Sequence, residues 1–234
     1  MKGIGILVAV LLWVGLAAAD NYFPLQIGST WNYVGAQGGV AKARVVGTQA
    51  ILGVDTVVRE WVRYSATASE SLANYWSMNS EGDVFLHGFT RYSDGLQLVY
   101  DPPVLFLDAP LSTGKTWQTT GVVYTDFAGA TPSGDTLTVG YEVSSEGDRT
   151  VPAGAWFGYA VREVLFSVRH ESDLVTAAGS SSPLGNDSVF EDWFVDGVGE
   201  IEIQTNEVFK LESRSLPPTA IEEISWTSIK ALYR

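Results

Sequence analysis

The chain contains no cysteine, so no disulfide can support the fold and no lipid can be attached to a cysteine near the N-terminus. Basic residues are scarce: 14 Lys and Arg stand against 27 Asp and Glu, a formal net charge of −13. Nucleic acids and anionic membrane surfaces are bound by basic patches, so this balance argues against both as partners. After residue 20, no apolar run approaches the length of about 20 residues that a spanning helix needs. The sequence therefore predicts no transmembrane segment in the mature chain.

The start of the chain has the three parts of a signal peptide. Lys2 supplies the positive charge, residues 4–16 form a short apolar run, and Ala17, Ala18 and Ala19 form a small-residue cleavage site. We expect residues 1–19 to be removed after Ala19. The mature protein would then start at Asp20 and reside in the periplasm or outside the cell.

Aromatic residues are abundant, with eight Trp, ten Tyr and ten Phe. Each buried ring can remove about 150–250 Å² from water, so the rings can supply the core that disulfides do not. We expect Trp31, Trp76, Trp117 and Trp193 to lie in this core. Trp156 stands in a glycine-flanked turn, and we expect it to be exposed.

One short pattern, P-L-x-x-G-x-T-W, occurs at residues 24–31 and again at 110–117. In each copy a glycine two residues before Thr-Trp favours a tight turn, and the residues that follow favour a strand. Shorter similarities follow in the same order along the chain: V-R-E at 58–60 and 161–163, Y-W and D-W at 75–76 and 192–193, and G-D-V and G-E-I at 82–84 and 199–201. The sequence thus predicts a single β domain over residues 20–216, built from half-repeats 22–106 and 107–215.

Short runs of strand-forming residues, broken by Gly, Asn, Asp or Ser, indicate an all-β fold. The tail, 217–234, differs: a capping box after two prolines predicts a short C-terminal helix over 219–232. We expect residues 171–188 to form a mobile loop and prolines 102 and 103 to end a strand. The expected strands are 30–35, 40–51, 54–64, 73–78, 83–91, 96–100, 116–127, 135–145, 157–169, 189–195, 200–204 and 207–215, with a short edge strand at 104–107.

Three stretches, 22–33, 150–156 and 193–201, resemble a group of bacterial exported domains of unknown function that is similar to the lipoprotein carriers (LolA/LolB-like). The resemblance implies a curved antiparallel sheet, a half-barrel whose concave face can hold apolar groups. It supplies no catalytic residues, and the expected helix lies at the opposite end of the chain from a carrier's lid.

No residue pattern carries a strong catalytic or metal signal, so we assign no catalytic, cofactor or metal residues. Gly114-Lys115-Thr116 matches the end of a phosphate-binding loop, but a strand follows it where that loop needs a helix. His87 lies in a strand, and His170 precedes Glu171 and Asp173, whereas a catalytic zinc usually has two histidine ligands. Acidic residues that would suit calcium lack the spacing of a calcium loop. These are Asp135, Asp187, Glu191 and Asp192.

Two hypotheses of function remain, and neither involves an enzyme or a cofactor. In the first, the exported protein binds a lipid or another apolar ligand in the concave face of the sheet. In the second, it is a structural or protein-interaction module of the cell envelope without a small ligand, and its C-terminal helix contacts a protein partner.

Overall fold

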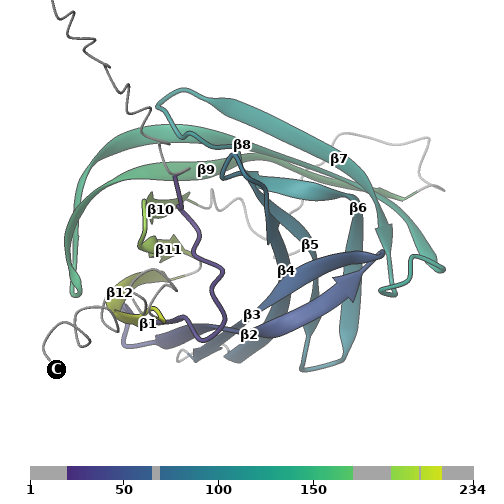
Figure 1. Ribbon diagram of the computed structural model, residues 1–234, viewed down its shortest axis with the longest axis horizontal. Coiled ribbons are helices and arrows are strands. Elements are labelled where there is room, and N and C mark those ends of the chain that lie inside the picture. The colour runs from purple at the N-terminus through teal and green to yellow at the C-terminus, as the bar shows by residue number, and fades with distance from the viewer. Residues whose placement is uncertain (1–19, 65–68, 171–190, 206, 218–234) are drawn as a thin grey trace, which may run out of the picture.

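The computed structural model describes residues 20–64, 69–170, 191–205 and 207–217. In these residues, antiparallel strands follow one another in chain order around a closed barrel (Figure 1). The strands are β1 (Thr30–Gly35), β2 (Val40–Ile51), β3 (Val54–Tyr64), β4 (Ser69–Met78), β5 (Val84–Arg91), β6 (Leu96–Leu107), β7 (Thr116–Tyr124), β8 (Pro132–Val151), β9 (Gly154–His170), β10 (Glu191–Val195), β11 (Gly199–Gln204) and β12 (Val208–Ser215).

The expected half-barrel is wrong, because the first and last strands pair. Strand β1 pairs with β12 from Thr30–Ser215 to Gly35–Phe209, so the sheet has no open concave face. Pairing of the two edge strands satisfies backbone groups that a half-barrel would expose. The described residues contain no helix, and none of them forms a helix long and apolar enough to cross a membrane. The predicted helix at 219–232 and the predicted loop at 171–188 lie outside the described residues.

Alternating burial shows how the sequence chooses the inner face. Along the first half of β2, Ala41, Ala43 and Val45 are buried while the residues between them are exposed. Ala43 lies opposite Trp31 on one side and Trp61 on the other. A small side chain between two large rings lets neighbouring strands fill the interior without a void.

The four Trp residues expected in the core are buried, as predicted. Trp31 and Trp193 belong to one apolar cluster, and Trp76 and Trp117 to another. Trp156 is half-buried against the first of these clusters, so the prediction that it is exposed was wrong. Its neighbour Phe157 is the exposed ring of that turn.

The two prolines expected to end a strand instead lie within β6. Leu86 pairs with Val104 and Gly88 with Val99, so residues 100–103 bulge opposite His87 alone. In a bulge the ladder is already interrupted, and a proline, which has no amide hydrogen, is tolerated there. Strand β6 therefore passes through the prolines, and 104–107 is part of an interior strand.

The two copies of the repeated pattern form the same turn. The Gly28 amide donates to the Val45 carbonyl at 2.9 Å, and the Gly114 amide donates to the Val143 carbonyl at 2.8 Å. Both glycines have positive φ, 94° and 84°, a backbone conformation that glycine adopts without strain. In each copy the same valine also donates its amide to the residue after the glycine, at 3.0 and 2.9 Å.

The two copies also share one feature of strand register, and it corrects one of the shorter similarities. Val45 pairs with Arg59 and Val143 with Val161, and each pair is followed by a register shift. Arg59 therefore occupies the place of Val161, whereas alignment of the V-R-E words would match it with Arg162. That residues 22–106 and 107–215 are half-repeats stays a prediction.

Candidate functional site

The residues before β1 form the most unusual element of the barrel. Residues 20–27, called the N-terminal strap below, run from the side of β8 and β9 across to β1 and belong to no strand (Figure 1). The Asn21 amide donates to Asp196 Oδ1 at 2.6 Å, and the Gly197 amide donates to the Asn21 carbonyl at 2.9 Å. These two bonds hold the start of the strap to the turn between β10 and β11.

Two aromatic residues of the strap are buried in the core. Tyr22 is 5% exposed and Phe23 is 2% exposed. The Phe23 ring centroid lies 4.7 Å from that of Trp76 and 5.7 Å from that of Phe106, and Tyr22 meets Tyr159 edge to face at 5.7 Å. The strap thus contributes side chains to the core that the strands of the barrel leave incomplete.

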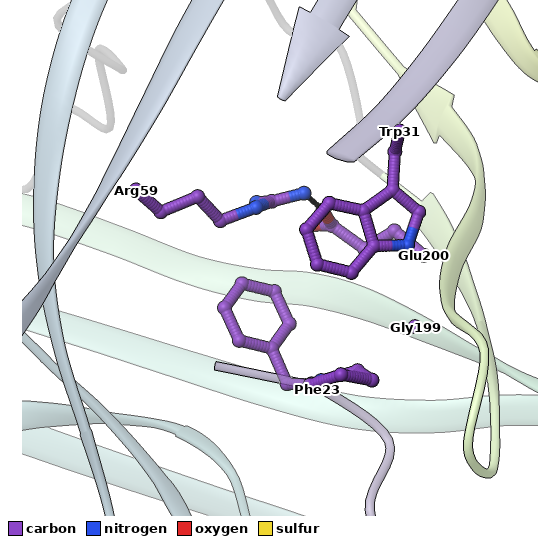
Figure 2. Close-up of a pocket in the computed structure, with 6 residues that line it drawn as sticks. Phe23, Trp31, Arg59, Gly199 and Glu200 are labelled. Atoms are coloured by element: carbon purple, nitrogen blue, oxygen red, sulfur yellow. Dashed lines mark hydrogen bonds and ion pairs between the residues drawn. The ribbon is translucent and has the colours of Figure 1, made fainter. Parts of the chain in front are cut away.

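A buried ion pair lies directly beside the strap. Arg59 on β3 contacts Glu200 on β11 through Nη2 and Oε2, and each residue is only 6% exposed. Figure 2 shows the guanidinium beside the rings of Phe23 and Trp31, whose centroids are 4.7 and 5.4 Å from Arg59 Cζ. The pair therefore joins the strap, β1, β3 and β11 at one point.

Neighbouring groups complete the polar environment of this pair. The Tyr33 hydroxyl donates to the Glu200 carbonyl at 3.2 Å, and Trp31 Nε1 donates to the Val198 carbonyl at 2.8 Å. Burial raises the pKa of the Tyr33 hydroxyl, so it stays protonated. Burial alone would lower the pKa of Arg59, but Glu200 and Tyr33 raise it above its usual value. Arg59 is therefore charged and neutralised by Glu200.

Two further acids near this centre have raised pKa values. Burial raises the pKa of Asp192 on β10 well above its usual value, and the Glu200 carboxylate raises it further. Asp192 Oδ1 accepts the Gln204 amide at 2.9 Å. Burial also raises the pKa of Glu163 on β9 to about 7. These carboxyl groups hold protons more tightly than exposed acids do, because burial disfavours their charged form.

The space around the ion pair is too small for a ligand. The hollow measures about 150 Å³ counting its open side, and it leaves no room for the centre of a water molecule. Among the described residues, no group of three or more His, Cys, Asp and Glu residues is arranged to hold a metal ion. The centre is therefore a buried ion pair whose arginine packs against two aromatic rings. The hollow is lined by Phe23, Pro24, Trp31, Arg59, Gly199 and Glu200.

The histidines singled out in the sequence lie away from this centre. His87 is 5% exposed, its Nε2 lies 2.8 Å from Ser77 Oγ, and burial lowers its pKa. A serine and a histidine in contact are two parts of a catalytic triad, but no carboxylate contact of His87 is seen in the described residues. His170 ends β9, while Glu171 and Asp173 lie outside the described residues.

The other sequence candidates take structural places. Lys115 Nζ donates to the Asp108 carbonyl at 2.6 Å and pairs with its carboxylate at 3.0 Å, so it closes a turn. Asp135 lies on β8, and Glu191 and Asp192 on β10, while Asp187 is outside the described residues. Sequence reasoning missed Phe23, Arg59 and Glu200. The sequence did contain one signal for Arg59, because this charged residue lies on the same face of the strand as Trp61.

Comparisons with known proteins add little to this picture. No family model and no curated protein matches the chain, so the resemblance to the lipoprotein carriers gains no support. The chain is similar to two solved structures. One is a candidate exported protein with a YmcC-like fold from Bacteroides fragilis, with 16% identity, a TM-score of 0.42, and coverage of 85% of this chain and 100% of that one. The other is a candidate lipoprotein from Parabacteroides distasonis, with 14% identity, a TM-score of 0.41, and coverage of 84% and 99%. Both TM-scores are too low to carry an argument about this chain.

Proposed function

We propose that this protein is exported and acts without catalysis, as a protein-interaction module of the cell envelope that carries no small ligand. The observation that supports this proposal is the tight packing around Arg59 and Glu200, where the strap enters the core of the barrel. Pockets for small molecules measure about 300–1,000 Å³, and here the hollow beside Arg59 and Glu200 leaves no room for a water molecule. A lipid carrier would need space that the strap and the core rings occupy.

The polar groups of the barrel support a role without catalysis. Arg59 and Glu200 neutralise each other, and both side chains are buried. His87 touches Ser77 and is buried within strand β5. A general acid or base must reach a substrate, and neither place offers an approach for one.

Export is supported by the signal peptide pattern, and the buried rings of Tyr22 and Phe23 bear on where cleavage occurs. Cleavage after Ala19 leaves Tyr22 and Phe23 on the mature chain, where they complete the core. Cleavage four residues later would remove both rings. N-terminal sequencing of the native protein should therefore find Asp20 first, and a chain that retains residues 1–19 would contradict this.

Native mass spectrometry of the purified full chain tests the absence of a ligand. We expect one mass, that of the chain from Asp20 onward, before and after extraction with organic solvent. A lipid that co-purifies in a stoichiometric amount and disappears on extraction would overturn the proposal. The matched control is the same protein unfolded in acid before measurement, because an unfolded chain retains no specific ligand.

A further inference from the structure

The strap is bound to the barrel in the way that a peptide is bound to a receptor. We propose that the groove under the strap is a peptide-binding site, and that it accepts the same segment from a second copy of this chain. The inference rests on the proposed function in one respect, that the partner is a polypeptide. It adds which surface binds, and what sequence it binds.

The backbone of the strap fits because two glycines make room for it. A Cβ atom on Gly82 would lie 2.6 Å from the Asp20 carbonyl oxygen, and one on Gly199 would lie 3.2 Å from Pro24 Cδ. Both glycines also have positive φ, 95° and 96°. The barrel therefore approaches the strap closely near both ends of the buried segment, where any other residue would clash or be strained.

The side chains of the strap supply the specificity of this site. Phe23 contacts the Arg59 guanidinium and the rings of Trp76 and Phe106, which come from β3, β4 and β6. Tyr22 contacts Tyr159 on β9. A receptor whose walls are aromatic, with one paired cation at its base, selects a peptide with two adjacent rings. The proline that follows them rests on Gly199.

The attachment of the strap allows it to be supplied by another molecule. Its covalent connection to β1 runs through Gln26, Ile27 and Gly28, which are exposed. Its sequence is the one that the groove fits, and a second copy of the chain carries the same sequence. Exchange of an identical element between two copies is a common route to a dimer. A strap in its own barrel has an effective concentration of about millimolar or more, so exchange needs concentrated chains that fold together.

Cleavage of the exposed connection between the strap and β1 tests whether the groove binds a peptide. A protease recognition sequence is inserted between Gln26 and Ile27 of the full chain, and the folded protein is then cleaved. We expect the fragment 20–26 to remain bound in native mass spectrometry and to be replaced by an excess of isotope-labelled synthetic peptide 20–26. A peptide with Phe23→Ala should bind at least about a hundredfold more weakly, because it lacks the ring that enters the core. The uncut protein, whose groove is filled, should take up neither peptide.

Loss of the fragment with no rebinding of the labelled peptide would overturn the inference. If the cut barrel unfolds when the fragment leaves, near-ultraviolet circular dichroism gives the answer: added peptide must restore the native signal, and failure to restore it counts against the groove. These results do not depend on the lipid measurement, so failure of the proposed function and failure of this inference can be told apart.

Refolding from urea at high concentration tests the second copy. We expect size-exclusion chromatography to show a dimer that forms with the wild-type chain and is at least about tenfold less abundant with Phe23→Ala, because the exchanged strap then lacks its main contact. A dimer that forms equally well with Phe23→Ala, or no dimer at all, would show that the strap is not exchanged between copies.

Discussion

The Arg59–Glu200 pair allows a sharp test of what stabilises the barrel. Changing Arg59 to Met replaces the charged side chain by an unbranched apolar one and leaves the Glu200 carboxylate buried without its partner. Glu200→Met likewise leaves the Arg59 guanidinium buried without its partner. Removal of one partner of a buried ion pair costs about 3–5 kcal/mol, so the two single changes together predict a loss of about 6–10 kcal/mol.

The double variant should be far more stable than this sum. Replacement of both partners of a buried pair by apolar residues is often neutral or stabilising by about 1–4 kcal/mol. Here the change also removes the cation beside Phe23 and Trp31, at a cost of about 1–2 kcal/mol for each ring. We therefore expect the double variant to be at most about 4 kcal/mol less stable than the wild type, which gives a coupling energy of about 2 kcal/mol or more.

Equilibrium unfolding in urea, followed by tryptophan fluorescence and far-ultraviolet circular dichroism, measures all four proteins. The matched control is Arg44–Glu60, an arginine–glutamate pair on β2 and β3 with a contact of 2.9 Å and side chains that are 53% and 27% exposed. Exposed pairs couple by about 0.2–1 kcal/mol. A coupling energy for Arg59–Glu200 no larger than that of the control would refute the reasoning.

Three other predictions concern the core, the pH dependence and the histidines. Trp31→Ala and Trp117→Ala should each lower the free energy of unfolding by about 3–5 kcal/mol in urea titrations, because each empties a buried site of a large ring; a loss below about 1 kcal/mol for either would count against its role as an anchor. The folded pKa of Glu163 is raised to about 7 from its usual 4.5, so its contribution to stability is present below about pH 4.5 and is lost as the pH rises to about 7. Glu163→Gln should make this decline in stability shallower, and an unchanged slope would contradict the assignment. His87→Gln should leave any biological activity nearly intact, and a loss of about 10²-fold, typical of a general acid or base, would reveal a catalytic site.

The strands could be predicted from the sequence because their signals are local. The expected bounds of β1, β2 and β3 agree with the structure, since glycine turns and runs of strand formers mark both ends of each. Closure of the barrel could not be predicted in this way. It depends on pairing between Thr30 and Ser215, and nothing in the residues near either strand indicates the other.

The candidate site was missed for the same physical reason. The burial of Arg59 depends on Glu200, which lies 141 residues further along the chain, and on Phe23 from the strap. Residues 54–64 do not separate cleanly into two faces by their polarity, because both faces of β3 carry charged and apolar residues. A buried charge can be recognised only when its partner is known.

The contacts of the strap also fix an order of events in time. Asn21 lies before the first strand, yet its partner Asp196 is 175 residues further along the chain. Trp31 and Tyr33 on β1 likewise donate hydrogen bonds to the carbonyl groups of Val198 and Glu200, which lie far along the chain. Folds with contacts this distant in sequence form slowly, because a long loop must close before the contact can stabilise it. We therefore expect the chain to complete its core only after β10, β11 and β12 have been synthesised, and to expose the aromatic residues of its first strands until then.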